Sequence, residues 1–573
     1  MLFYTKKISL VTTIGKIDKM PLVVIIILAI LFSYSMLFNG YYPDGIHLML
    51  ANYSDAPLHL SFINELQVHF PPQNPGFAGT QLHDYHFFSD YVLAKIIQLF
   101  HIDKIFAYFQ LFPILISLLW GTGTYLFIKR WIDNRAAALW AVILTQFGGS
   151  FVFLTYLFGY SGLNLNSGFG MLQPGSSVLN PPYATSIVLV IFGLFSLLRY
   201  LQTNKKGWIF PIILFFGLAA EFKVYAGIIL FGGFVLLMIL KAMKQQFHFL
   251  WIFLGMIIIF ALTYLRVIGK GGFLIFFPYW APISVARANL RFLSYDNQMA
   301  TYEGFHMWHR IIWLQLKIFI IFLFGNIGSR IIGIILLYFY PLKKKFFFSE
   351  FTITVLCMLG ISFFLPLFFI QSIKPFEITQ MFNYFLFFVS LFAAIGLGAF
   401  FTRPFSLFIK IAVSLFVILL VLPTNYDVYY NYLPTSYPSI STKAYKAMKY
   451  LEQQESYSST VLVMPEQQIF PPNYAWIHST NLFVPAFANK RAYLNDQNLT
   501  FPDDVKKRGV FVESLATIEE PSKSTKVTKK DITENLHKNH IRFIYSPYKF
   551  PVVGDIGIKS IYISNEAYIY KVL

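Results

Sequence analysis

The chain has 573 residues, of which 56% are hydrophobic, 19% aromatic and only 13% charged. Soluble domains contain about 45–50% apolar and about 25% charged residues, so this composition indicates an integral membrane protein. The formal net charge of +18 does not indicate nucleic-acid binding, because much of the basic excess lies in short loops between apolar runs, where it orients membrane helices. The single cysteine, Cys357, excludes a disulfide framework and a thiolate metal site.

Apolar runs follow one another along the chain, each close to the length of about 20 residues that a membrane-spanning helix needs. Run 208–240 carries Glu221 and Lys223 in its middle and predicts two short helices joined by a tight turn, whereas run 311–340 is interrupted by GNIGSR and predicts one broken helix. The first run is expected to be a retained anchor, because no small-residue cleavage site follows it. Together the runs predict a mainly α, polytopic transmembrane bundle of about 11 helices. The runs are 21–39, 105–128, 136–160, 183–201, 208–240, 249–267, 311–340, 351–370, 381–401 and 405–423.

The basic clusters predict the orientation of this bundle, because cytoplasmic loops collect lysine and arginine. Clusters before run 21–39 and after runs 105–128, 183–201, 208–240 and 311–340 all fall on one side if the N-terminus is cytoplasmic. The other side then receives segments 40–104, 161–182 and 268–310 and everything after residue 423. We expect a multi-pass protein of the cell (inner or plasma) membrane whose functional site lies on the extracytoplasmic face.

The last part of the chain has the pattern of a small soluble domain. AYKAMKYLEQQ predicts a helix, VLVMP a short buried strand, DITENLHKNHIRFIYSP a helix running into a strand, and KSIYISNEAYIYKV a β-hairpin. We therefore divide the chain into a transmembrane domain, 1–423, with a first outer loop at 40–104, and an extracytoplasmic α/β domain, 424–573.

The first outer loop is dense in titratable groups, and it holds six of the twelve histidines. In SDAPLHLSFINELQV, Ser54 or Asp55 can cap a helix whose first turn tolerates Pro57, and Asp55 and His59 then lie four residues apart on one side of that helix. This helix is expected to lie along the membrane surface, as is a second one at 87–100. Taken alone, Asp55 is more simply a capping residue. The HDYH run at 83–86 offers two histidines without a third ligand, which is a weak signal for a metal site.

A single spanning helix followed by a long outer loop that opens on an acid resembles the GT-C class of membrane glycosyltransferases. PPQNPGFAGTQLHDYHFFSD (71–90), AAEFKVYAG (219–227) and VPAFANKRAYLND (484–496) are similar to blocks of poorly characterised bacterial and archaeal relatives. In that class an Asp early in the first outer loop is the catalytic base, and Asp55 stands at the matching place. Ala56 stands where a second acid is common, so metal dependence does not follow from the resemblance; no cofactor is assigned, and a divalent metal stays an open alternative.

The resemblance implies an inverting glycosyltransferase that moves a sugar from a polyprenyl phosphate to an extracytoplasmic glycan, lipid or protein during cell-envelope polysaccharide biosynthesis. Asp55 would take the proton of the acceptor hydroxyl, and His59, Asp84 and His86 would orient it or the acceptor. The departing phosphate needs fixed cations near the membrane interface. The candidates for this role are Lys223, Arg266, Arg287, Arg291 and Lys374.

Two other classes of function stay open from the sequence. A transporter or lipid flippase would often show two matching halves with interrupted helices, and no such symmetry is visible. A non-catalytic membrane protein of polysaccharide assembly could keep the same fold, because fold does not fix function. Neither the sugar, the acceptor, the polyprenol nor the oligomeric state follows from the sequence.

Overall fold

The computed structural model describes residues 19–83, 85–160, 162–264, 273–290, 293–372, 374–434, 437–455, 457, 459–465, 482–495, 502–516, 529–549 and 556–573. The chain divides into two compact units, which are described separately. The helical unit takes the described residues within Met1–Ser35, Pro113–Leu265 and Gly271–Asn431, and the α/β unit takes those within Met36–Phe112 and Tyr432–Leu573.

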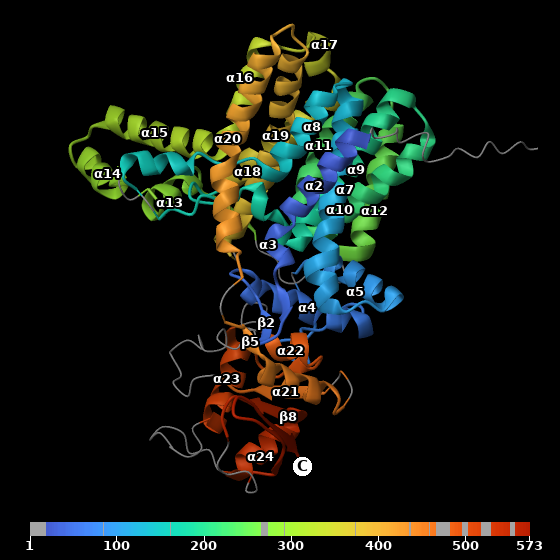
Figure 1. Cartoon of the computed structure of the whole chain (residues 1–573), viewed down its shortest axis with the longest axis vertical. Helices are drawn as coiled ribbons and strands as arrows, with labels where there is room; N and C mark the ends of the chain where they lie inside the picture. The colour runs from blue at the N-terminus through green and yellow to red at the C-terminus, as the bar shows by residue number, and fades with distance from the viewer. Residues whose placement is uncertain are drawn as a thin grey trace, which may run out of the picture. The chain divides into compact units, whose positions relative to one another are not determined.

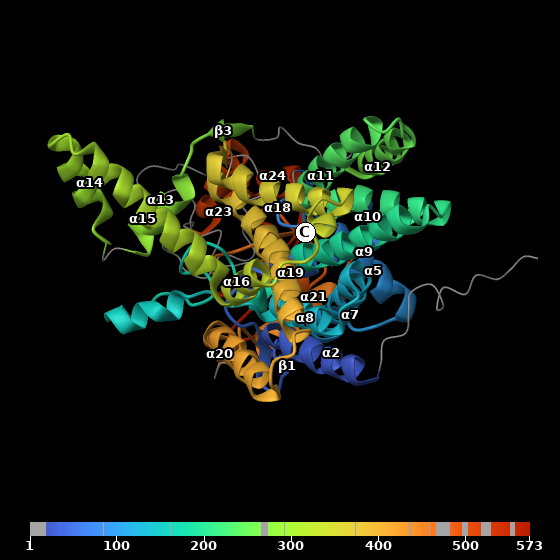
Figure 2. The ribbon, with the colours of Figure 1, turned by 90° about the horizontal axis from the view of Figure 1, so that it is seen from above.

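The helical unit is built from long apolar helices (Figures 1 and 2). Seven helices of the described residues are long and apolar enough to cross a membrane, which confirms a multi-pass membrane protein. Its main helices are α2 (Lys19–Phe32), α7 (Phe112–Ile132), α8 (Arg135–Phe147), α9 (Pro181–Thr203), α10 (Ile209–Phe222), α11 (Val224–Ala242), α12 (His248–Tyr264), α13 (Trp280–Ala288), α14 (Tyr295–Gly304), α15 (Trp308–Ile327), α16 (Ile331–Phe339), α18 (Glu350–Phe368), α19 (Met381–Phe401) and α20 (Leu407–Asn431). Shorter elements are α3 (Tyr34–Leu37), α17 (Lys344–Phe347), the 3-10 turns η2 (Val152–Phe158), η3 (Pro174–Leu179), η4 (Lys206–Trp208), η6 (Gly328–Arg330) and η7 (Pro375–Gln380), and an antiparallel pair of strands, β3 (Leu274–Phe276) and β4 (Phe369–Gln371).

Both predicted interruptions are confirmed. A single extended residue, Lys223, separates α10 from α11, and η6 separates α15 from α16. The prediction that residues 136–160 form one membrane span was wrong, because α8 ends at Phe147 and the chain continues through Gly148 and Gly149 into η2.

The α8 end and the α15–α16 break support each other through close backbone contacts. Ser329 N donates to Gly149 O at 2.9 Å, and Gly149 N donates to Ser329 Oγ at 3.0 Å. Gly328 has φ +51°, and a Cβ there would lie 2.0 Å from Gly149 O, so no larger residue fits at this contact.

Arg330 lies at the same junction and is fully buried. Its guanidinium donates to Ser390 Oγ at 2.7 Å, to Gln173 Oε1 at 2.9 Å and to Gly148 O at 3.2 Å. It also reaches Ile327 O at 3.3 Å, so it contacts carbonyls at the C-terminal ends of both α8 and α15. Each helix C-terminus carries about half a negative charge, and two such ends compensate the buried cation.

Helix α19 forms the core of the helical unit and packs against α8, α16 and α18. The contact with α16 depends on glycine, because a Cβ on Gly396 would lie 1.9 Å from Gly333 O. Small residues allow membrane helices to approach closely enough for dense van der Waals packing. This packing buries α19 more deeply than any other candidate span among the described residues.

The α/β unit combines the first loop with the C-terminal region. From the loop come β1 (Gly40–Tyr42), β2 (Gly45–His47), α4 (Asn52–Val68), α5 (Phe88–Phe100), α6 (Lys104–Phe106) and the π-helix η1 (Ala107–Leu111). The C-terminal region supplies β5 (Ile440–Ser441), α21 (Thr442–Glu452), β6 (Thr460–Val463), α22 (Phe483–Phe487), β7 (Arg491–Ala492), α23 (Pro502–Ala516), α24 (Lys529–Lys538), β8 (Ile541–Ser546), β9 (Ile558–Ile563) and β10 (Tyr568–Val572). The predicted helices, strands and terminal hairpin of this region are confirmed. One sheet has the order β1-β2-β5 and the other β7-β6-β8-β10-β9, with β6 parallel to β7 and β8.

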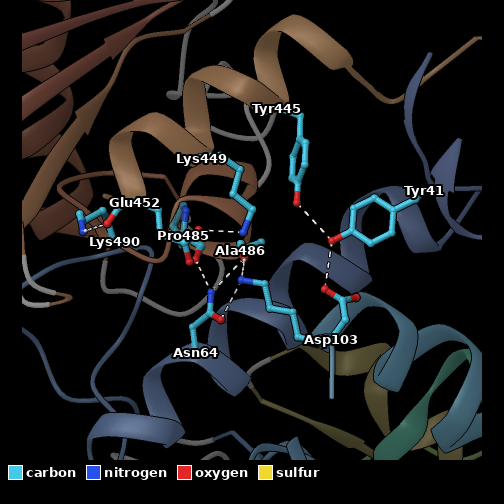
Figure 3. Close-up of polar contacts among 10 residues, drawn as sticks. Tyr41, Asn64, Asp103, Tyr445, Lys449, Glu452, Pro485, Ala486 and Lys490 are labelled. Carbon is cyan, nitrogen blue, oxygen red and sulfur yellow. Dashed lines mark hydrogen bonds and ion pairs between the residues drawn. The ribbon is translucent and has the colours of Figure 1, made fainter. Parts of the chain in front are cut away.

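The two parts of the α/β unit share strands and buried polar contacts. Strand β2 pairs with β5, and Asn64 Nδ2 donates to Pro485 O at 2.8 Å and Ala486 O at 2.9 Å (Figure 3). The Glu65 carboxylate is fully buried and accepts two hydrogen bonds from the Arg491 guanidinium, at 2.9 and 3.0 Å. The loop and the C-terminal region therefore form one folded body.

Candidate functional site

Asp55 lies in the first turn of α4, and its side chain is exposed. The prediction that Ser54 or Asp55 caps this helix was wrong, because α4 begins at Asn52 and Ala51 occupies the cap position without a side-chain hydrogen bond. The Asp55 carboxylate instead accepts a hydrogen bond from Ser54 Oγ at 3.2 Å. The carboxylate is therefore not committed to capping the helix, although it lies in the first turn, where the helix dipole favours a negative charge.

His59 follows one helical turn later and points into the unit, with 5% of its surface exposed. Its Nδ1 lies 3.0 Å from each carboxylate oxygen of Asp90, a residue of α5 that is itself buried. Burial raises the pKa of the Asp90 carboxyl, and the neighbouring His59 opposes this rise. A carboxylate on Nδ1 fixes the orientation of a histidine ring and holds the proton on that nitrogen.

Aromatic rings surround the His59–Asp90 pair. Tyr108 stacks on the imidazole with ring centroids 6.1 Å apart, and Phe62 and Tyr85 lie at 6.5 and 6.4 Å. Tyr108 belongs to the π-helix η1, a type of distortion that often occurs at functional sites. Its hydroxyl is buried and makes no hydrogen bond to the described residues. The site thus contains a buried polar atom that the described residues leave unsatisfied.

For the other two predicted catalytic residues, Asp84 and His86, the structure gives less evidence of a role. His86 is partly buried and stacks on Tyr85 at 4.6 Å, and Asp84 lies outside the described residues. The described residues contain no group of three or more His, Cys, Asp or Glu side chains that could hold a metal ion.

The predicted phosphate-binding cations that the structure describes belong to the helical unit. Lys223 is 3% exposed at the junction of α10 and α11. Arg287 pairs with Asp296 at 2.8 Å, and Lys374 pairs with Glu377 at 3.5 Å, both on the surface of the unit. Arg266 and Arg291 lie outside the described residues.

Sequence reasoning missed Asp90, Tyr108 and the pairing of Glu65 with Arg491. Asp90 was placed in the second surface helix without a role, although an acid inside an amphipathic helix is itself a signal for a buried partner. Tyr108 gave no signal, because a π-helix has no sequence signature. The Glu65–Arg491 pair joins positions 426 residues apart and could not be found from local spacing.

The sequence matches no protein-family model and no curated protein. The structure resembles that of arabinofuranosyltransferase AftD from mycobacteria, with a TM-score of 0.53 and 10% identity over 98% of this chain and 40% of AftD. A second AftD structure, which carries a point substitution, gives a TM-score of 0.52 and 12% identity over 97% of this chain and 42% of AftD.

ArnT from Cupriavidus metallidurans, bound to undecaprenyl phosphate, covers 96% of this chain and 98% of its own at 11% identity, but its TM-score of 0.46 supports no argument about this protein. At such low identity the likeness to AftD concerns the fold alone. The polytopic GT-C-like fold with a small C-terminal sheet, predicted from the sequence, is confirmed.

Proposed function

We propose that this protein is an inverting membrane glycosyltransferase that transfers a sugar from a polyprenyl-phosphate donor to an extracytoplasmic acceptor, with Asp55 as the general base. The observation that carries the proposal is an exposed, non-capping carboxylate in the first turn of the first loop helix. The fold that this chain shares with an arabinofuranosyltransferase gives the proposal further support.

The proposed reaction is a single displacement at the anomeric carbon of the sugar. The acceptor oxygen forms a bond to that carbon while the bond to the lipid phosphate breaks, and the acceptor proton moves to the Asp55 carboxylate. The phosphate leaves with the electron pair and is stabilised by cations. Lys223, Arg287 and Lys374 are the described candidates, with Arg266 and Arg291 as further ones.

His59 and Asp90 have a supporting role in this proposal. Their paired, buried geometry keeps α4 and α5 together and therefore holds Asp55 in place. Asp84 and His86 are proposed to contact the acceptor. The protein is proposed to work in the inner or plasma membrane with its N-terminus in the cytoplasm and the α/β unit outside.

The test is a transfer assay with purified protein and a panel of radiolabelled polyprenyl-phosphate sugars. Asp55→Asn should lower transfer by about two to four orders of magnitude, the range that general-base catalysis contributes. A matched control is Asp504→Asn, because the Asp504 carboxylate is half exposed on α23 and pairs with Lys507. An Asp55→Asn protein that transfers as fast as the control would refute the role of Asp55, and a chelator in the same assay decides the open question of a divalent metal.

A further inference from the structure

Helices α13, α14 and α15 form an arm that leaves the rest of the helical unit sideways. Figure 1 shows α15 lying across the direction of α16 and α19, and Figure 2 shows α13–α15 extending away from the other helices. The change of direction occurs at η6, where Gly328 has φ +51°. By length and composition alone, Trp308–Phe339 is one candidate membrane span.

Helix α15 has two different faces. Leu314, Ile318 and Phe322 recur every four residues and are buried. On the opposite face, Trp313 is 65% exposed and Ile320 is 42% exposed. An apolar face of this kind is stable only against other apolar groups, such as acyl chains.

A cationic flank borders that apolar face. Arg310 and Lys317 are seven residues apart, so they lie on the same side of α15. Both are exposed, and Lys317 has no ion-pair partner among the described residues. A charged side chain costs about 2.5–3.5 kcal/mol at the centre of a membrane helix and much less near the headgroups, so Lys317 favours an interfacial position.

The side of the arm away from the apolar face is polar. Helix α14 packs against α15, with Gln315 Nε2 donating to Tyr295 Oη at 2.9 Å and the Arg310 guanidinium 5.7 Å from the Tyr302 ring centroid. Its own sequence, YDNQMATYEG, is polar and mostly exposed. The arm therefore presents water-compatible groups on one side and hydrocarbon-compatible groups on the other.

We propose that the α13–α15 arm lies in the plane of the membrane surface, with the apolar face of α15 in the acyl chains and Arg310 and Lys317 on the phosphate groups of anionic lipids. Interfacial helices bury their apolar face about 5–10 Å into the boundary between headgroups and chains.

The depth of α15 can be measured in nanodiscs that each hold one full-length chain. In a Cys357→Ser background, a nitroxide or fluorophore is attached at Ile312→Cys or Ile320→Cys, and its depth is read by lipid-borne quenchers. Phe408→Cys and Phe416→Cys on α20 are the matched controls, because they are exposed and also eight residues apart. An eight-residue separation along a spanning helix corresponds to about 12 Å of depth. We expect equal depths for the two α15 labels and a difference of about 12 Å for the two α20 labels.

A depth difference of about 12 Å between the two α15 labels would overturn the proposal and show that α15 spans the bilayer. Absence of lipid quenching at both α15 labels would also overturn it, because the apolar face would then not lie in the acyl chains. The headgroup contact is tested by the ratio of quenching from brominated anionic and zwitterionic lipids. Lys317→Gln and Arg310→Gln should each lower this ratio about fivefold, whereas Glu303→Gln, on the polar side, should leave it unchanged. An unchanged ratio in both cation variants would remove the lipid phosphates from the proposal.

Discussion

Replacing Arg491 by methionine is expected to destabilise the α/β unit by about 3–5 kcal/mol, the cost of leaving one member of a buried ion pair without its partner. The Glu65 carboxylate is fully buried and the Arg491 side chain is 9% exposed, so water cannot take the place of the lost guanidinium. The backbone N–H of Gln73 also donates to this carboxylate, at 3.1 Å. The guanidinium also lies 5.3 Å from the Tyr457 ring centroid, a contact that methionine partly replaces.

Hydrogen exchange of the α4 amides in the full-length protein measures this change locally, because α4 carries Glu65 and packs against α22 of the C-terminal region. The Glu65→Leu/Arg491→Met double variant is the decisive comparison. Replacing both members of a buried pair by apolar residues is often neutral or stabilising, so the double variant should recover most of the lost protection. A loss below about 1 kcal/mol in Arg491→Met, or a double variant as unstable as the single one, would refute the assignment of Glu65–Arg491 as a buried ion pair.

Three further outcomes are expected. Burial raises the pKa of the Asp90 carboxyl above its value in the unfolded chain, so the folded state keeps this proton to a higher pH. The free energy of unfolding therefore falls as pH rises above the usual Asp range. Asp90→Asn should flatten the dependence of the melting temperature on pH from 4 upward and should leave the His59 ring in place. Burial raises the pKa of Tyr548 to about 12. The buried hydroxyl therefore contributes stability that is lost as pH rises from about 10 to about 12. Tyr548→Phe should reduce this loss of stability in an alkaline unfolding curve. Arg330→Met removes four hydrogen bonds to oxygens at the junction of α8 and α15 and should lower the melting temperature in detergent. An unchanged melting temperature would mean that the C-terminal ends of α8 and α15 need no cation between them.

The helices were predictable where the signal is local. The break at Lys223 and the break at GNIGSR follow from polar or glycine-rich residues inside an apolar run, and both appear in the structure. The early end of α8 was not predicted, because Gly148–Gly149 is compatible with a membrane helix until Gly328 packs against it from 180 residues away.

The candidate site was also predictable only where the sequence signal is local. The four-residue spacing correctly placed Asp55 and His59 in the first turns of one helix, but His59 turns inward to Asp90, 31 residues away. Helical periodicity gives the face of a residue and not its partner. The assignment of Asp55, His59, Asp84 and His86 to catalysis therefore stays a prediction that transfer assays must test.

The composition of the α/β unit sets an order of events during synthesis. Glu65 leaves the ribosome 426 residues before Arg491, and at about 5–20 residues per second that interval is about 20–85 s. Throughout it the first loop must persist without strand β5, helix α22 or the cation that compensates its buried carboxylate. A nascent or prematurely ended chain therefore carries the Asp55 segment without the guanidinium that compensates Glu65 and without the strand that pairs with β2.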